Sequence, residues 1–337
     1  MINLGIIGAG RIGKVHAKSI LTSGLPVRVK GIADPLMNAE TEAWAKASGI
    51  DGVFLDHRRI LEDKDIEAVL ICSSTDTHSP ISIEAIEAGK HIFCEKPIDH
   101  DVAKIQSVIK KLAETDLKYQ VGFNRRFDHN FKAVKAAITA GAVGEPHILR
   151  ITSRDPAPPP VEYIRVSGGI FLDMMIHDFD MVRFLLDCEV EEVFAKGAVL
   201  VDPEIGEAGD IDTAIVTLKM KSGALAVIDN SRKAVYGYDQ RAEVFGSKGC
   251  VSASNDAPST AVISNENGVL AEKPHYFFLE RYMQAYQDEM LSFINAIIND
   301  TPTEVNITDG LKPVLIGLAA KKSLEENRPV SLKEIGA

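Results

Sequence analysis

A glycine-rich turn near the N-terminus constrains the fold of this chain most strongly. Residues 3–8 form a short apolar run that predicts a buried strand, and a helical pattern begins directly after the turn. Between them lies Gly8-x-Gly10-x-x-Gly13, and Asp34 ends the next apolar run. A strand, glycines at this spacing, a helix and an acidic residue about 20 positions further on are the fingerprint of a dinucleotide-binding βαβ unit.

The chemistry of this turn indicates its ligand. Bare glycine backbone lets a pyrophosphate approach the start of the helix, where free N–H groups and the helix dipole favour an anion. A carboxylate at Asp34 accepts hydrogen bonds from ribose hydroxyls and repels a 2′-phosphate, so NAD is favoured over NADP. The alternative is a tight turn and a helix cap without a ligand. The residues predicted to contact NAD here are Gly8, Gly10, Arg11, Ile12, Gly13 and Asp34.

Strands and helices alternate through the N-terminal part of the chain. Apolar runs at 91–94 and 119–123 alternate with helical patterns at 79–89 and 101–115. Repeated βα units with buried apolar strands predict a parallel sheet that helices cover on both faces. The sequence therefore predicts an NAD-binding, doubly wound Rossmann domain over residues 1–123.

The pattern changes after residue 124, where we expect a second domain that extends to residue 337. Helices are predicted at 128–141 and 170–187, on either side of a proline-rich loop. Consecutive strand-like runs joined by turn signals then predict a mostly antiparallel sheet, so the fold class is α/β plus α+β. The predicted strands are 190–201, 211–220, 224–231, 241–245 and 250–253, and the closing helices are 279–299 and 309–326.

Composition excludes several kinds of partner. Lys and Arg number 37 against 48 Asp and Glu, and the net charge of −11 repels nucleic acid in the absence of a basic cluster. No apolar run is long enough to span a bilayer, and the N-terminus does not resemble a signal peptide. We therefore expect a cytoplasmic protein with no membrane partner. The four cysteines are widely spaced, without Cys/His clustering, so no metal site is predicted.

The tripeptide Glu95-Lys96-Pro97 follows a predicted strand at the carboxyl edge of the sheet, where open α/β folds bind ligands. A lysine there can hold or polarise a substrate oxygen, and its charge favours ionised forms of nearby groups. A solvated ion pair on a turn is the alternative. We expect Glu95 and Lys96 to lie beside the cofactor.

A second polar segment, Ser74 to His78, lies on a loop at the same edge of the predicted sheet. We expect His78 to approach the nicotinamide half of the cofactor. Ser74 and Thr75 are predicted to contribute further cofactor contacts.

A predicted helix carries an acid and a base on one face. Asp173 and His177 stand at positions i and i+4. An imidazole that titrates near neutrality suits proton transfer to or from an alcohol, and a carboxylate one turn away can orient it. Hydride transfer from an alcohol needs such a base besides the cofactor. Hydrogen bonding on a helix surface is the alternative, and we expect Asp178 and Asp180 to be capping or surface charges.

Further polar residues are candidates for substrate contacts. Arg125 and Arg126 lie at the expected domain boundary, where either can bind polyol or phosphate oxygens or form interdomain salt bridges. Asp155 on the proline-rich loop offers a carboxylate. Tyr236 and Tyr238 offer hydroxyls, although packing explains tyrosines at these positions equally well.

The chain resembles, over essentially its whole length, the glucose-fructose oxidoreductase and inositol dehydrogenase (Gfo/Idh/MocA) family of NAD(P)-dependent oxidoreductases. The motifs that carry the resemblance are Gly8-Ala-Gly-Arg-Ile-Gly13, Ser74-Thr-Asp-Thr-His78, Glu95-Lys-Pro97, Asn124-Arg-Arg-Phe127 and Gly169-Ile-Phe-Leu-Asp-Met-Met-Ile-His-Asp-Phe-Asp-Met181. The last two look particularly like those of inositol 2-dehydrogenases, as do Tyr236-Gly-Tyr-Asp-Gln-Arg241 and Phe278-Leu-Glu-Arg-Tyr282.

The resemblance implies a role for each motif. His177 becomes the general base, Asp173 holds it and contacts substrate, and Lys96 polarises the reacting oxygen. The second domain becomes a substrate-binding domain whose open antiparallel sheet joins subunits into a homotetramer. The substrate-binding residues are then Lys96, Arg126, Asp155, Asp173, His177 and Tyr236.

The activity implied by the resemblance is the NAD-dependent oxidation of myo-inositol at C2 to 2-keto-myo-inositol (scyllo-inosose). Scyllo-inositol, D-chiro-inositol or a monosaccharide such as glucose remain alternative substrates, because stereoisomer choice transfers poorly within a fold. An NAD-binding regulator without turnover is an alternative of another class. A lyase or glycosidase that uses NAD transiently is a third.

Overall fold

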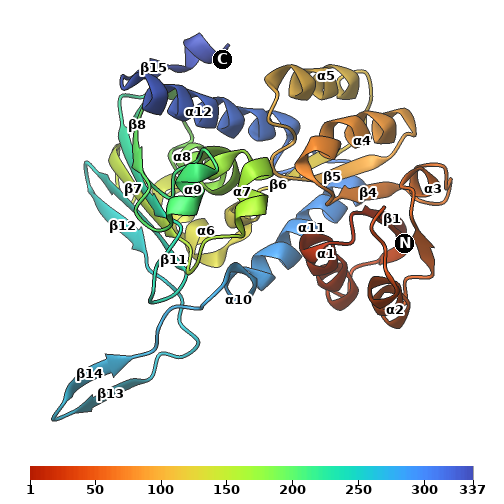
Figure 1. Ribbon diagram of the computed structural model, residues 1–337, viewed down its shortest axis with the longest axis horizontal. Coiled ribbons are helices and arrows are strands. Elements are labelled where there is room, and N and C mark those ends of the chain that lie inside the picture. Colours follow the sequence, from red (N-terminus) through yellow and green to blue (C-terminus); the bar gives the residue numbers. More distant parts are fainter. Residues whose placement is uncertain (337) are drawn as a thin grey trace. The chain divides into compact units, whose positions relative to one another are not determined.

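The computed structural model describes residues 1–336 and divides into two compact units (Figure 1). The first unit comprises Met1–Asn124 together with Gln284–Leu311, and the second comprises Arg125–Met283 and the C-terminal segment from Lys312. The boundary after Asn124 lies next to the one expected from the sequence. The return of segment 284–311 to the first unit was not foreseen in the sequence.

The first unit is built on a six-stranded parallel sheet of order β3-β2-β1-β4-β5-β6. The order reverses between β1 and β4, which makes this the predicted doubly wound Rossmann sheet. Its strands are β1 (Ile2–Ile7), β2 (Val27–Ala33), β3 (Gly52–Phe54), β4 (Ala68–Ile71), β5 (His91–Glu95) and β6 (Tyr119–Gly122).

Helices pack their apolar stripes against this sheet. In α1 (Arg11–Thr22), Val15, Ala17 and Ile20 are buried at helical spacing. Helix α11 (Met283–Ile298) adds Met290, Phe293 and Ile294 to the same core cluster as the sheet residues, which explains why this late segment belongs to the first unit. The other helices of the unit are α2 (Ala39–Ala47), α3 (Arg58–Leu61), α4 (Thr75–Glu87) and α5 (Val102–Leu112).

The second unit is built on a seven-stranded sheet of order β12-β11-β7-β10-β9-β8-β15. Only the β7–β10 pair is parallel among the described strands of this sheet, so the prediction of a mostly antiparallel sheet is confirmed. The strands are β7 (Pro146–Arg154), β8 (Val190–Ala198), β9 (Thr213–Met220), β10 (Leu225–Ser231), β11 (Asp239–Gly246), β12 (Gly249–Ala253) and β15 (Val330–Ser331).

Besides the two-residue β15, two β elements were missed in the sequence. Strand β7 lies inside the sheet, but only Leu149 and Ile151 supply large apolar side chains to its buried positions, and Ser153 fills the third. So short an alternation is a weak strand signal. The other is a hairpin of β13 (Val262–Asn265) and β14 (Gly268–Ala271), which is exposed throughout and projects from the rest of its unit (Figure 1).

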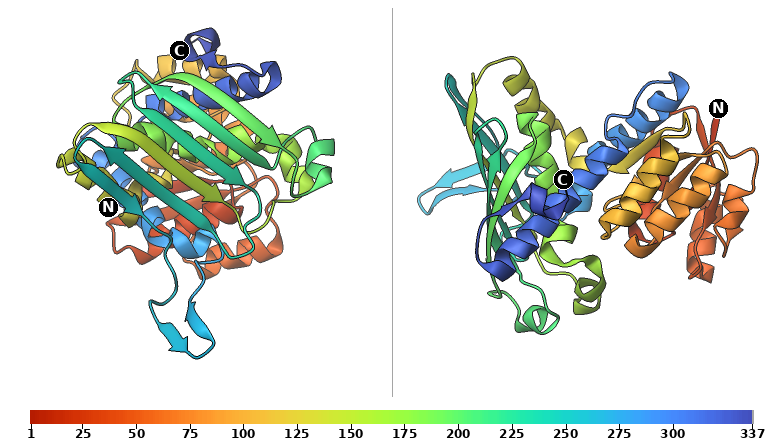
Figure 2. Two further views of the ribbon diagram at one scale, coloured as in Figure 1. Left: turned by 90° about the vertical axis from the view of Figure 1, so that its left-hand side faces the viewer. Right: turned by 90° about the horizontal axis from the view of Figure 1, so that it is seen from above.

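Helices α6 (His129–Thr139) and α8 (Ile176–Leu186) pack on one face of the large sheet. Figure 2 shows the opposite face, on which no described helix of this unit lies. Strand β9 alternates buried and exposed residues accordingly. The remaining helical segments are α7 (Val161–Ser167), α9 (Pro203–Glu207), α10 (Phe278–Arg281), α12 (Ile307–Glu326) and the short turns Asn124–Phe127, Ile170–Met174 and Leu332–Ile335.

None of the helices in residues 1–336 is both long enough and apolar enough to cross a membrane. The cytoplasmic location stays a prediction. Within the same residues, no three His, Cys, Asp or Glu side chains gather in the way a metal site requires.

Candidate active site

The glycine turn after β1 is shaped for close approach by a ligand. Gly8 has a φ of +105°, and a Cβ there would lie 2.5 Å from the backbone of Cys72. A Cβ on Gly13 would lie 2.0 Å from the Gly8 carbonyl oxygen, whereas a Cβ on Gly10 would meet no atom within 4 Å. The outer two glycines are therefore required by packing, and the middle one leaves open backbone at the start of α1, where a pyrophosphate fits.

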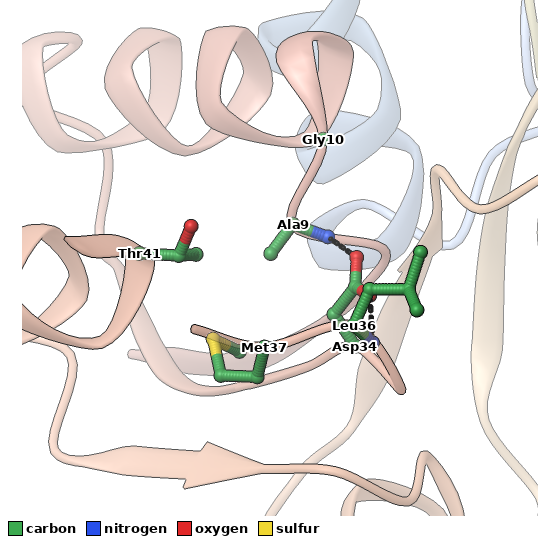
Figure 3. A pocket seen from close by; sticks show the side chains of 6 residues that line it. All are labelled: Ala9, Gly10, Asp34, Leu36, Met37 and Thr41. Carbon is green, nitrogen blue, oxygen red and sulfur yellow. Dashed lines mark hydrogen bonds between the residues drawn. The ribbon is translucent and has the colours of Figure 1, made fainter. Parts of the chain in front are cut away.

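Asp34 faces this turn from the end of β2. One oxygen, Oδ2, accepts from the Ala9 N–H at 2.7 Å, and Oδ1 accepts from the Leu36 N–H at 2.8 Å. These bonds fix a negative charge beside a pocket of about 200 Å³ (Figure 3). The pocket is lined by Ala9, Gly10, Asp34, Leu36, Met37 and Thr41. The residues present thus fit the ribose end of a dinucleotide, and contact of Asp34 with the ribose stays a prediction.

The segment after β4 differs locally from its prediction. The helix expected from residue 79 begins at Thr75, so His78 lies within α4 and is 2% exposed. Its Nδ1 lies 2.8 Å from the Pro97 carbonyl oxygen and its Nε2 lies 3.0 Å from that of Ser73. Burial alone lowers the pKa of His78, but Cys94 and these carbonyls outweigh it and raise the pKa to about 9. A protonated ring donates to both carbonyls, which braces the backbone at Pro97.

Contact of His78 with the cofactor stays a prediction, since both ring nitrogens face backbone oxygens. Ser74 and Thr75 stand at the N-terminal end of α4 and keep side-chain exposure. Both side chains are exposed enough to contact a ligand, and their contacts with NAD stay predictions.

Lys96 follows β5 at the same carboxyl edge of the parallel sheet as Gly8 and Asp34. Its side chain is partly exposed. Glu95 is instead buried, with Oε1 lying 2.6 Å from His16 Nε2 and Oε2 accepting from the Lys96 N–H at 3.2 Å. The roles predicted for Glu95 and Lys96 stay predictions, but the structure directs the Glu95 carboxylate inward and leaves the Lys96 side chain partly exposed.

In the second unit, Asp173 and His177 do not lie on one regular helix, which corrects the prediction of a single helix from residue 170. Residues 170–174 form a π turn, in which the Met175 N–H donates to the Ile170 carbonyl oxygen at 2.8 Å, and α8 begins at Ile176. π turns are frequent at functional sites. From 171 to 180, only Asp173 and His177 keep partial exposure, and every other residue is buried.

Asp173 is held by two side chains that the sequence did not single out. The Tyr163 hydroxyl donates to Oδ1 at 2.9 Å, and Arg232 Nη1 donates to Oδ2 at 3.4 Å. Arg232 is 1% exposed and also lies 3.6 Å from Asp210. The signal in the sequence was the position of Arg232 directly after a predicted strand. An arginine that is buried at such a position needs carboxylate partners.

Asp155 belongs to the same group of charges. Burial raises the pKa of Asp155 to about 6, although Arg232 lowers it, and Asp173 raises it further. The structure therefore brings Asp155, Asp173 and Arg232 together in the second unit. A carboxyl that changes charge near pH 6 can accept a hydrogen bond from a substrate hydroxyl once it is ionised.

Asp178 and Asp180 correct a prediction, because they are buried and not capping or surface charges. Arg125 Nη1 lies 2.6 Å from Asp178, and Arg126 holds both oxygens of Asp180, at 2.8 and 2.6 Å. A buried carboxylate requires such pairing. Both ion pairs lie within the second unit. The guanidinium of Arg126 already binds Asp180, and its contact with substrate stays a prediction.

The two candidate tyrosines differ in exposure. Tyr238 is buried and stacks edge-on against Tyr282, which supports packing as its role. Tyr236 is 39% exposed, donates to Asp239 at 2.5 Å and accepts from Arg154 at 3.2 Å. The Tyr236 side chain is therefore exposed enough to contact substrate, and this contact stays a prediction.

The strand order, the glycine turn and the carboxylate after β2 define the class of the first unit as a dinucleotide-binding domain. Residues 2–123 match the model of an oxidoreductase family with an NAD-binding Rossmann fold, and residues 131–252 match the GFO/IDH/MocA C-terminal domain. The chain belongs to the GFO/IDH/MocA family of oxidoreductases, and its first unit binds NAD.

Similar proteins cover the full length of the chain. Myo-inositol 2-dehydrogenase of Thermotoga maritima is 50% identical over 99% of both chains. The crystal structure of a putative myo-inositol dehydrogenase from Sinorhizobium meliloti is 47% identical, covers 98% of this chain and 100% of that chain, and superposes with a TM-score of 0.94. That of scyllo-inositol dehydrogenase from Lactobacillus casei, with bound NAD(H) and scyllo-inositol, is 30% identical, covers 99% of each chain and has a TM-score of 0.92.

Proposed function

We propose that this protein is an NAD-dependent inositol 2-dehydrogenase that oxidises myo-inositol at C2 to 2-keto-myo-inositol. One observation carries the proposal: Asp173 and His177 are the partly exposed side chains of an otherwise buried segment. Sequence similarity supports the proposal, since the chain is 50% identical to the Thermotoga maritima myo-inositol 2-dehydrogenase over 99% of its length. The more distant scyllo-inositol dehydrogenase makes scyllo-inositol the second candidate.

The proposed chemistry divides between the cofactor and three side chains. NAD, held by the glycine turn and Asp34, would supply the acceptor for the hydride that leaves the carbon carrying the reacting hydroxyl. His177 takes the hydroxyl proton as the C–H bond breaks, so the two electrons of the O–H bond become the second bond of the carbonyl. Lys96 stabilises the negative charge that develops on that oxygen, and Asp173 orients the imidazole and stabilises its protonated form.

Asp173 is prepared for this role by its partners. Tyr163 and Arg232 each donate to one of its oxygens, so the carboxylate is held in a single orientation. Held carboxylates lose little conformational freedom on binding a ligand. We assign Asp155, Arg126 and Tyr236 to the ring hydroxyls of the substrate. Of these, Asp155 has the strongest support, because its charge state is coupled to Asp173 and Arg232.

We also propose that the protein is a homotetramer. Its subunits are joined through the face of the second unit's sheet on which no described helix of this unit lies. Leu225 on β10 and Phe245 on β11 both pair in register with Ile148 on β7. All three are exposed, and together they form an apolar row across three strands. Contiguous exposed apolar side chains mark protein interfaces. Light scattering coupled to gel filtration should give a tetramer, and Phe245→Asp should give smaller species; a monomeric wild-type protein contradicts this assignment.

The deciding experiment is the initial rate of NADH formation with myo-inositol, scyllo-inositol, D-chiro-inositol and glucose, each with NAD and with NADP. We expect the highest kcat/KM with myo-inositol and NAD. A preference for scyllo-inositol would retain the mechanism and change the substrate. Binding of NADH without turnover of any of the four would contradict the proposal and favour an NAD-binding regulator.

A further inference from the structure

A buried glutamate, Glu95, precedes Lys96 in the sequence, and a buried histidine, His16, contacts this glutamate. His16 lies on α1, the helix that begins at the glycine turn, and is fully buried. Its Nε2 lies 2.6 Å from Glu95 Oε1. The two residues are 79 positions apart in the sequence, so this contact joins the helix after β1 to the end of β5.

The second oxygen of Glu95 is also engaged. Glu95 Oε2 accepts from the backbone N–H of Lys96 at 3.2 Å. On the β6 side, a Cβ on Gly122 would lie 3.0 Å from the same oxygen, so the absence of a side chain at Gly122 makes room for the carboxylate. Glu95 therefore holds the backbone from which the Lys96 side chain starts, and His16 holds Glu95.

The packing around the pair leaves His16 little freedom. The ring of Phe93 meets the imidazole edge-on at a centroid distance of 4.9 Å, and that of Tyr286 at 5.5 Å. Edge-to-face ring contacts at these distances are favourable and directional. The imidazole is thus fixed between β5, α11 and Glu95.

Two further ionisable groups lie close enough to Glu95 for their charges to interact, Cys72 and, on α11, Glu289. Glu289 is fully buried, and its carboxyl oxygens accept no hydrogen bond from any residue between 1 and 336. Burial raises the pKa of Glu289 well above its usual range, and the charge of Glu95 raises it further. Both effects favour the neutral form of the Glu289 carboxyl.

We propose that His16 and Glu95 are positioning residues for Lys96, which fix the backbone of this lysine against the cofactor-binding helix so that its amine meets the reacting oxygen. The inference rests on the role of Lys96 in the proposed function. Neither residue touches the reacting atoms. Their effect on the reaction is exerted through the placement of Lys96, because catalytic rates are sensitive to misplacements of about 1 Å.

The test is a double-mutant cycle between His16→Leu and Lys96→Ala. Loss of the imidazole frees Glu95, so we expect His16→Leu to lower kcat by about 10- to 100-fold. Because the effect acts through Lys96, the double variant should be no slower than Lys96→Ala alone. His16→Gln, whose side-chain amide can replace the Nε2–H donor, should restore most of kcat.

The matched control is His57→Leu, which removes a His–Glu pair of similar geometry from the surface of the same unit. His57 Nε2 lies 2.7 Å from Glu84, and both side chains are partly exposed. We expect its kcat and its affinity for NADH to equal those of the wild type. Fluorescence titration with NADH and thermal unfolding of each variant show whether the cofactor site and the fold remain intact.

Three outcomes overturn the inference or its basis. A kcat for His16→Leu equal to that of His57→Leu contradicts the positioning role. Multiplicative losses in the double variant also contradict it, since they indicate a structural effect independent of Lys96. Near-normal turnover of Lys96→Ala alone contradicts instead the part of the proposed function that assigns Lys96 to the substrate oxygen.

Discussion

Each unit holds a cluster of ionisable groups, and the two clusters differ in exposure. In the first unit, His16 and Glu95 are buried and face each other or the backbone. In the second unit, Asp173 and His177 keep partial exposure, and Arg232 beside them is buried. Buried ion pairs add little net stability, because desolvation offsets their attraction. The difference therefore separates groups that hold backbone geometry from groups that are available to a ligand.

The largest expected effect lies on the exposed side of this comparison. His177→Ala should lower kcat by about 10²- to 10⁴-fold, the usual contribution of a general base. Binding of NADH should be unchanged, because the glycine turn and Asp34 belong to the other unit. Steady-state rates and NADH titration measure the two quantities.

His129→Ala is the control for this variant, since His129 is an exposed histidine on α6 of the same unit. Its kcat should equal that of the wild type. If His177→Ala and His129→Ala turn over at equal rates, the imidazole of His177 is not the base.

The next effect tests the buried partner of the exposed pair. Arg232→Met leaves Asp173 and Asp210 without the guanidinium that lies 3.4 and 3.6 Å from them. Breaking a buried ion pair costs about 3 to 5 kcal/mol of unfolding free energy. Arg150→Met, which breaks an exposed pair with Glu243, should cost at most about 1 kcal/mol. Equal losses in urea unfolding would contradict the difference in burial.

The same variant has a pH signature. The Arg232 charge lowers the pKa of Asp155, which burial raises to about 6. Without Arg232 this pKa rises further, so a larger fraction of Asp155 is protonated at any given pH. If ionised Asp155 binds a substrate hydroxyl, the acid limb of the kcat/KM profile moves to higher pH. An acid limb that moves to lower pH, or stays in place, would exclude Asp155 from substrate binding.

The two units also differed in how far the sequence could predict them. The glycine turn could be predicted because a backbone with φ of +105° at Gly8, and a Cβ 2.0 Å from a carbonyl oxygen at Gly13, impose local demands on residue type. Such demands survive in a motif of fixed spacing. The parallel sheet was predicted from the alternation of apolar runs and helical patterns.

Contacts between distant segments left no such local signal. The pairing of His16 with Glu95, and of Arg232 with Asp173, depends on how elements pack. Asp178 was misinterpreted for the same reason, since a charged residue in a helical pattern reads as surface until its arginine partner is known. The π turn at 170–174 was not predicted, because its apolar residues show no period that distinguishes it from a regular helix. The roles of Lys96, Asp173 and His177 were implied by the resemblance to a family.

A moderate effect is expected at the cofactor end of the first unit. Asp34→Ala removes the acceptor of the Ala9 and Leu36 N–H groups and the charge that faces the pocket. Hydrogen bonds to charged groups contribute about 1.5 to 3 kcal/mol, so the dissociation constant for NADH should rise about 10- to 100-fold. Discrimination against NADPH should relax, because the repelling charge is gone.

Asp51→Ala is the control for Asp34, since Asp51 forms an exposed ion pair with Arg28 in the same unit. Its affinity for NADH should not change. Unchanged cofactor preference in Asp34→Ala would show that Asp34 does not bind the ribose. Unlike His177→Ala, Asp34→Ala should keep its kcat once the cofactor is saturating.

The smallest effect sharpens the buried side of the comparison. The pKa of Glu289 is raised in the folded protein, so the folded state retains a proton that the unfolded state releases above about pH 4.3. Stability from this group is fully present below that pH and is lost as the pH rises towards the folded pKa. Glu289→Gln removes the titration, so its unfolding free energy should gain on that of the wild type by at most about 1.4 kcal/mol per pH unit.

Urea unfolding from pH 5 to pH 9 measures this difference. Glu114→Gln provides the reference, because Glu114 is an exposed glutamate of the first unit and its neutralisation should leave a constant offset. A gap between Glu289→Gln and wild type that widens with pH places the proton on Glu289 in the folded protein. A gap that stays constant from pH 5 to pH 9 would mean that Glu289 is already ionised in the folded protein, because no proton is then released on unfolding.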